Sequence, residues 1–329
     1  MKKQDSETMN TAPQSIVVGI CAGIASAMLV LSALAFPLLN FLFMFLSLVP
    51  VLVAGIGWSN RAGIISVFIG AIILGIATAP FIAALFAGAL FAPAAWIAHL
   101  TNLARPADEI GGPEGELAWY PLSRLFLYIC GISAALSSLQ ILAVGDSQEM
   151  RDTYLMLLEE FIAQTPEAET IPLSSMEAAI DQFLAIMPFL LGAFLVLLLF
   201  FGWYVSARLA DKFGRSKRPR DDLPAHLRMQ PIAIPILGAG LIVYFVGGGL
   251  SAAGLAITGA FTAGFTLSGL AMLHFATRGK PWRLLLLWFA YVVVFIASMM
   301  PLVAFFIAGL FGTTRTSAQT SPNKNDTTT

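Results

Sequence analysis

The chain has 329 residues, of which 58% are apolar and 11% are charged, and its formal net charge is −1. An ordinary soluble domain carries roughly 25% charged residues, so water cannot be the solvent for most of this chain. The near-zero net charge also excludes the basic character of nucleic-acid-binding proteins, and we expect no nucleic-acid partner.

Long uncharged runs predict an all-α transmembrane helical bundle. A bilayer core about 30 Å thick needs about 20 apolar residues of helix, because every backbone polar group must be satisfied within the segment. About nine spans are expected, within a range of eight to ten. They lie at 15–36, 38–58, 62–79, 81–99, 122–145, 183–206, 232–250, 252–276 and 283–311. The last run contains Pro301, so it is either one long span or a full span with a short kinked or re-entrant piece.

The predicted membrane domain covers 15–311, between two polar tails. Residues 1–14 and the Thr-rich 312–329 are expected to be disordered. Lys2 and Lys3 before an apolar run resemble a secretory signal peptide. That run is longer than a signal peptide needs and a second span follows at once, so we expect it to stay uncleaved.

The distribution of charge predicts the orientation in a bacterial inner membrane. With a cytoplasmic N-terminus, fifteen of the eighteen Lys and Arg residues fall on the cytoplasmic side. The opposite side receives the segment 146–182, which carries nine acidic residues and only Arg151. Reversing the topology would invert this bias.

Two loops are candidates for contact with partners. The cytoplasmic loop 207–230 contains a basic patch of Arg215, Lys217, Arg218 and Arg220. The patch either attracts anionic lipid, worth about 1 kcal/mol per base, or docks a cytoplasmic partner.

The acidic external segment 146–182 is predicted to form two amphipathic helical pieces, divided at Pro166 and Pro172. Ser174 and Glu177 match a capping box that would start the second piece. The segment either covers the external mouth of the bundle or lies in the membrane interface with no further role.

The residues needed for catalysis are scarce. No Asp or Glu falls within a predicted span, no paired-His spacing occurs, and no P-loop is present. We therefore expect no enzyme activity, no metal site and no cofactor. His274, near the cytoplasmic end of the eighth span, is interpreted as an interfacial side chain. The absence of intramembrane charge also disfavours a proton-coupled transporter.

Two patterns of small and polar residues remain as candidate sites. Gly19, Gly23 and Ala27 repeat every four residues in the first span, which gives a helix face for packing within the chain or against a separate subunit. In the eighth span, Thr258, Thr262 and Thr266 align three hydroxyls. Each hydroxyl either bonds back to the carbonyl four residues earlier or lines a ligand cavity.

Short motifs resemble the YybS-like family of uncharacterised bacterial membrane proteins. They are Pro37, the stretch 119–122 entering the fifth span, and the stretch from Gly269 to Tyr291 that includes His274 and Trp282. That family is a domain of unknown function, distantly similar to the S components of energy-coupling-factor transporters. This likeness implies a small-molecule ligand and docking, through a stripe such as Gly19, Gly23 and Ala27, on a separate membrane subunit with ATPases. S components usually have fewer spans than this chain.

Two functions from different classes follow. The first is small-molecule binding or a transport-related role, with the lipid bilayer as surroundings and an unknown ligand. The second is a non-catalytic membrane scaffold or assembly factor that holds partners through the basic loop and the acidic external segment. A pocket walled by the three threonines would favour the first function, and a solid bundle would favour the second.

Overall fold

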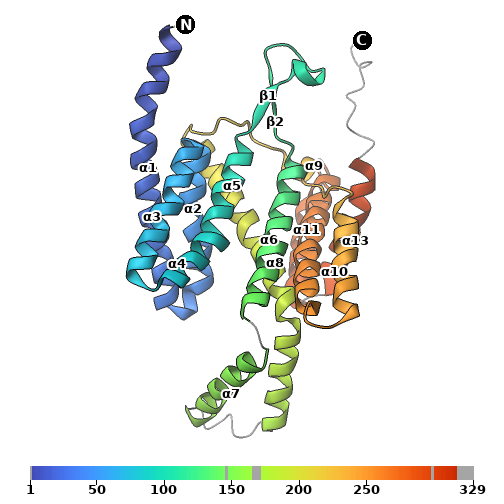
Figure 1. Ribbon diagram of the computed structural model, residues 1–329. Helices are drawn as coiled ribbons and strands as arrows, with labels where there is room; N and C mark the ends of the chain where they lie inside the picture. The colour runs from blue at the N-terminus through green and yellow to red at the C-terminus, as the bar shows by residue number, and fades with distance from the viewer. Residues whose placement is uncertain (1, 145–146, 165–171, 298–299, 317–329) are drawn as a thin grey trace.

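The chain forms a bundle of helices in a computed structural model that describes residues 2–144, 147–164, 172–297 and 300–316 (Figure 1). Strands in these residues are confined to one short hairpin, β1 (Ala104–Pro106) and β2 (Leu117–Trp119), in which Arg105 pairs with Ala118. The predicted all-α membrane bundle is confirmed.

The first half of the bundle consists of helices that run alternately up and down. They are α1 (Lys2–Ala35), the 3-10 turn η1 (Pro37–Leu39), α2 (Asn40–Gly57), α3 (Asn60–Ala77), α4 (Pro80–Phe86), the π-helical turn η2 (Ala87–Phe91) and α5 (Ala92–Thr101). The π-helical turn precedes Pro93, whose missing N–H cannot complete a regular α-helical ladder.

The second half follows the β-hairpin, whose tip holds the 3-10 turn η3 (Asp108–Ile110). Its helices are α6 (Leu122–Val144), α7 (Ser147–Gln164), α8 (Leu173–Lys212), α9 (Leu223–His226), α10 (Ala233–Val246), α11 (Ser251–Ala276), α12 (Arg283–Ile296) and α13 (Met300–Thr316).

Ten apolar segments are present in the described residues, seven of them long enough to cross a membrane and three shorter. The shorter ones are Ala233–Val246, Arg283–Ile296 and Met300–Thr313. The run 283–311, for which one long span and a span with a short extra piece were both left open, is two helices, α12 and α13. The break falls next to Pro301, which cannot donate a helical hydrogen bond. The chain is a multi-pass membrane protein.

The two ends of the bundle differ in charge. One end, here called the basic end, holds the start of α1, the β-hairpin, α9 with the loop 213–232, and the end of α13 (Figure 1). The opposite end, called the acidic end, holds α7 and the first part of α8. Both termini of the described chain thus lie at the basic end.

Helix α11 is the centre of the second half, where it packs against α6, α8, α10 and α13. Phe261 and Phe265 on α11 are among the largest fully buried side chains, together with Phe126 on α6. Outward-facing side chains are apolar as well, such as Leu284 and Phe295 on α12, which are 81% and 90% exposed. Such a surface fits lipid rather than water.

The helices described differ from the predicted boundaries in three details. Residues 2–14, expected to be a disordered tail, continue α1 as helix, and α13 continues past 311 to Thr316. Residues 317–329 lie outside the described residues. The basic loop begins later than expected, since α8 remains helical to Lys212.

The acidic segment is helical on both sides of its prolines, as predicted, although Pro166 lies outside the described residues. The capping box is wrong: α8 begins at Leu173, and its N-cap, Pro172, has no side-chain hydrogen bond. Helix α7 packs on α8 through an Arg151–Asp181 ion pair of 2.6 Å. It lies next to the first part of α8, beyond the end of the bundle (Figure 1).

Candidate binding pocket at the basic end

Helices α8 and α11 run in the same direction and touch backbone to backbone. A Cβ atom added to Gly192 would lie 2.1 Å from the carbonyl oxygen of Ala256, and one added to Gly259 would lie 2.0 Å from that of Phe189. Only glycine allows this approach at both positions. From this contact towards the basic end, the two helices leave a space between them.

That space is a groove-like pocket of about 710 Å³ that is more open than enclosed. Its walls come from α8, α11, α12 and the loop that contains α9. The lining residues are Phe200, Phe201, Tyr204, Arg208, Arg220, Asp221, Asp222, Leu223, Pro224, Leu227, Leu267, Leu270, Ala271, His274, Arg278 and Tyr291. A volume of this size is typical of small-molecule sites, which are mostly apolar with a few polar groups.

The wall formed by α8 changes from apolar to cationic towards the basic end. Phe201, Tyr204 and Arg208 follow at spacings of three and four residues, so they share one helix face over about 10 Å. The Arg208 guanidinium donates a 3.1 Å hydrogen bond to Tyr204 Oη and lies 5.0 Å from the centre of that ring. Its partner is therefore a neutral group.

The wall formed by α11 repeats this gradient. Leu270, His274 and Arg278 follow at four-residue spacings. His274 Nε2 lies 2.8 Å from Tyr291 Oη, a hydrogen bond that joins α11 to α12. Because α8 and α11 run in the same direction, the cationic parts of both walls meet at the same end of the pocket.

The loop over this end is held by two ion pairs. Arg218, which is buried, pairs with Asp221 at 2.7 Å and donates a second 2.7 Å hydrogen bond to the carbonyl oxygen of Tyr120. Arg278 pairs with Asp222 and thereby ties the end of α11 to the loop. The hydrogen bond from Arg278 holds the pKa of the Asp222 carboxyl below its usual value.

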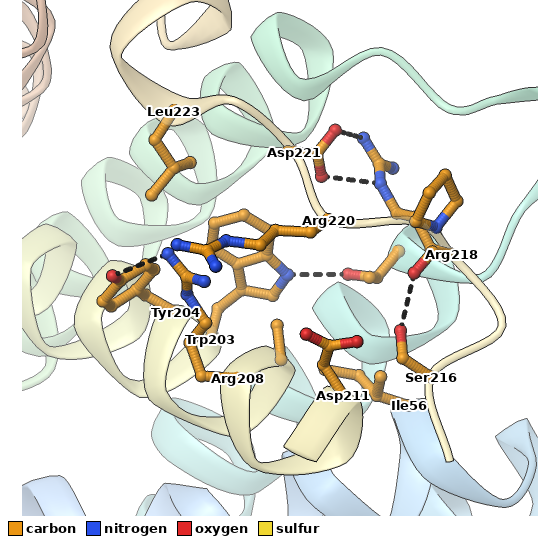
Figure 2. A pocket seen from close by; sticks show the side chains of 13 residues that line it. Ile56, Trp203, Tyr204, Arg208, Asp211, Ser216, Arg218, Arg220, Asp221 and Leu223 are labelled. Atoms are coloured by element: carbon orange, nitrogen blue, oxygen red, sulfur yellow. Dashed lines mark hydrogen bonds and ion pairs between the residues drawn. The ribbon is translucent and has the colours of Figure 1, made fainter. Parts of the chain in front are cut away.

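A smaller cavity of about 40 Å³ adjoins the pocket and shares with it Tyr204, Arg208, Arg220, Asp221 and Leu223 (Figure 2). Trp203 Nε1 donates a 2.9 Å hydrogen bond to Thr101 Oγ1 across it, which joins α8 to α5. Figure 2 shows the side chains of Arg208 and Arg220 reaching into the same part of this cavity from α8 and from the loop.

The structure separates the four residues of the predicted basic patch. Arg215 stacks on Trp58 at 5.0 Å from the ring centre, and Arg218 is buried in its ion pair. Lys217 is exposed and lines neither cavity. Arg220 alone faces the pocket.

The three predicted threonines line neither cavity. Thr258 Oγ1 donates to the carbonyl oxygen of Gly254 at 2.9 Å, and Thr266 Oγ1 donates to that of Thr262 at 2.8 Å. For Thr258 and Thr266 the structure thus shows the back-bonding alternative, and the threonine-lined cavity is not found in the described residues.

The small-residue stripe of α1 packs within the chain. A Cβ atom added to Gly19 would lie 2.8 Å from the carbonyl oxygen of Ala62, and one added to Gly23 would lie 2.7 Å from that of Ser66. Ala27 is fully buried. Helix α3 occupies this face, so it is not open to a separate subunit.

Sequence reasoning passed over Tyr204, Arg208 and Tyr291, and interpreted His274 as an interfacial side chain. The signal was present in the spacing of Phe201, Tyr204 and Arg208, which places a ring, a hydroxyl and a cation on one helix face. The pairing of α8 with α11, which turns two such faces into a pocket, depends on the tertiary fold.

No family model matches the chain, and neither a curated protein nor a solved structure is found to be similar to it. The resemblance to the YybS-like family therefore stays a prediction.

Proposed function

We propose that this protein binds a small amphiphilic molecule in the pocket between α8 and α11. The observation that carries the proposal is the pocket itself: about 710 Å³, with apolar walls on the side of the bundle core and charged residues at its mouth. A ligand with an apolar body and a polar end would match both parts.

The proposal includes an orientation, in which the basic end faces the cytoplasm of a bacterial inner membrane. The excess of Lys and Arg in the loop 213–232 and the acidic residues of α7 support this direction. The mouth of the pocket would then lie at the level of the cytoplasmic headgroups.

A transport-related role is the natural extension of ligand binding in a membrane. The chain contains no P-loop, so ATP-driven transport would need a separate ATPase subunit. Because α3 covers the stripe of Gly19 and Gly23, such a subunit would have to dock elsewhere than on an S-component-like α1 face.

A membrane scaffold is the alternative function. It is favoured by one observation, which is that α7 and the first part of α8 stand beyond the bundle at the acidic end (Figure 1). Their charged surface would be open to a protein partner.

The test is purification in mild detergent followed by mass spectrometry of small molecules and proteins released on denaturation. The variant Ala271→Phe places a ring in the pocket, and Ala276→Phe makes the same change at an exposed site of the same helix. We expect a stoichiometric amphiphile with the native chain and with Ala276→Phe, and about tenfold less with Ala271→Phe. The milder variant Ala271→Leu covers the case in which Ala271→Phe misfolds.

Two results would contradict the binding function. The native chain would release no small molecule, or all variants would release equal amounts. Envelope proteins that co-purify without any ligand would favour the scaffold.

A further inference from the structure

We infer that the ligand carries a phosphate group, held between Arg208 and Arg220, with its alkyl part along Phe201 and Leu270. The inference rests on the proposed function and adds the chemistry of the ligand's polar end. It is carried by the charges at the mouth of the pocket and by the way in which they are paired.

The carboxylates of the pocket are already neutralised. Asp222 pairs with Arg278, and Asp221 pairs with Arg218. A third carboxylate nearby, Asp211, lines only the smaller cavity, and within the described residues it forms no ion pair.

Two guanidinium groups at the mouth lack a counter-ion. Arg208 has only the neutral Tyr204 hydroxyl and ring as partners, and Arg220 has no hydrogen bond or ion pair in the part of the chain that the structure describes. Both side chains line both cavities, and they come from different elements, α8 and the loop. An anion between them would gain two cationic partners at once.

A phosphate monoester matches this arrangement better than a carboxylate does. It carries roughly −1.5 to −2 charge and three acceptor oxygens, so it can accept forked hydrogen bonds from two guanidinium groups. A carboxylate has two oxygens and a single charge, which one arginine satisfies. Free phosphate would fill only the mouth, whereas the apolar walls beneath it favour a phosphorylated amphiphile.

The test measures binding to the full chain in nanodiscs of phosphatidylcholine by titration calorimetry, with empty nanodiscs as the background. The probes are decyl phosphate, decanol and inorganic phosphate. Arg208→Gln and Arg220→Gln are compared with Lys217→Gln, which removes an equal charge from the loop that holds Arg220, at a site that lines neither cavity. We expect decyl phosphate to bind at least about tenfold more weakly to both arginine variants, and within twofold of the native affinity to Lys217→Gln.

The outcomes distinguish a free phosphate ion from a phosphorylated amphiphile, and they distinguish failure of the phosphate inference from failure of the proposed amphiphile binding. If inorganic phosphate binds as tightly as decyl phosphate and needs both arginines, the phosphate site stands and its source is the free ion. If decanol binds as tightly as decyl phosphate and the arginine variants are unchanged, the phosphate inference is overturned while the amphiphile pocket stands. An equal loss of affinity for decyl phosphate in Lys217→Gln would also overturn the phosphate inference, because general surface charge would then explain the binding. If neither decyl phosphate nor decanol binds, the proposed function itself fails.

Discussion

At the scale of single residues, several helix contacts depend on the absence of a Cβ atom. Gly269 on α11 and Gly309 on α13 face one another where these helices cross. A Cβ atom added to Gly269 would lie 1.8 Å from the carbonyl oxygen of Phe305, and one added to Gly309 would lie 1.9 Å from that of Phe265. Both obstacles are backbone atoms, so a larger residue must push the helices apart.

We therefore predict that Gly269→Ala destabilises the protein by about 1–3 kcal/mol, the usual range for an overpacked core. The measurement is the midpoint of thermal unfolding in detergent. Gly131→Ala is the matched control, because nothing lies within 4 Å of its added Cβ atom and alanine favours the helix. A Gly269→Ala variant as stable as Gly131→Ala would show that α11 and α13 do not cross as described.

The Asp222–Arg278 ion pair predicts a pH dependence of stability. Because the pair lowers the pKa of the folded Asp222 carboxyl, its contribution is fully present above the unfolded value of about 3.9 and is lost as the pH falls through the lower folded value. Asp222→Asn should lower the unfolding midpoint slightly at pH 7 and have no effect near the acid limit.

Arg278→Gln should reproduce this behaviour, and the double variant should add little to either single change. If Asp222→Asn lowered the unfolding midpoint equally at every pH, the carboxylate would not be stabilising the fold through its charge.

Single residues of the pocket were predictable only in part. The cluster of bases around Arg220 is evident from the sequence, but which of its members faces a cavity is not. Lys217 and Arg220 are three residues apart in an irregular loop, and only the ion pairs of Arg218 and Asp222 orient that loop over the pocket. The Asp222–Arg278 pair and the hydrogen bond from Arg218 to the carbonyl oxygen of Tyr120 join segments that are distant in sequence, so no local pattern encodes them.

At the scale of elements, hydropathy predicts where most helices lie in the sequence, but it does not predict which helices pack against one another. The uncharged runs predict most spans to within a few residues, because the bilayer requires continuous apolar helix. The break between α12 and α13 was left open, since Pro301 is compatible with a kink as well as with a new helix. The stripe of α1 predicted close packing, but its partner could have been another subunit as easily as α3.

The contact of α1 with α3 gives a prediction at this scale. Gly23→Leu should lower the unfolding midpoint, because its side chain would collide with Ile69 and with the carbonyl oxygen of Ser66. Ala25→Leu, on the exposed side of the same helix, should leave the midpoint within the error of the measurement. The alternative, that the stripe docks a separate subunit, requires Gly23→Leu to spare the stability of the isolated chain and abolish only co-purification of a partner.

At the scale of the whole molecule, the number of crossings decides what lies beside the pocket. Nine spans would place the C-terminal end on the acidic side. With the ten apolar segments found, the described end of α13 lies at the basic end (Figure 1). Ten crossings would also place Arg315 on the side that already holds most of the basic residues.

The parity of the crossings can be tested with a fluorescent protein that matures only in the cytoplasm, fused after Thr316. Ten crossings with a cytoplasmic basic end predict a fluorescent fusion, whereas nine predict a dark one.

Labelling with a membrane-impermeant maleimide determines independently which end faces which side of the membrane. Asp152→Cys on α7 should react in intact spheroplasts, and Lys217→Cys should react only after permeabilisation. The native Cys21 and Cys130 lie within the apolar stretches of α1 and α6, and the unsubstituted chain measures the background that they contribute. A dark fusion, combined with a Lys217→Cys that does not react in intact spheroplasts, would show that α12 and α13 do not both cross the membrane. Helix α12 would then not place Tyr291 in the wall of the pocket as described.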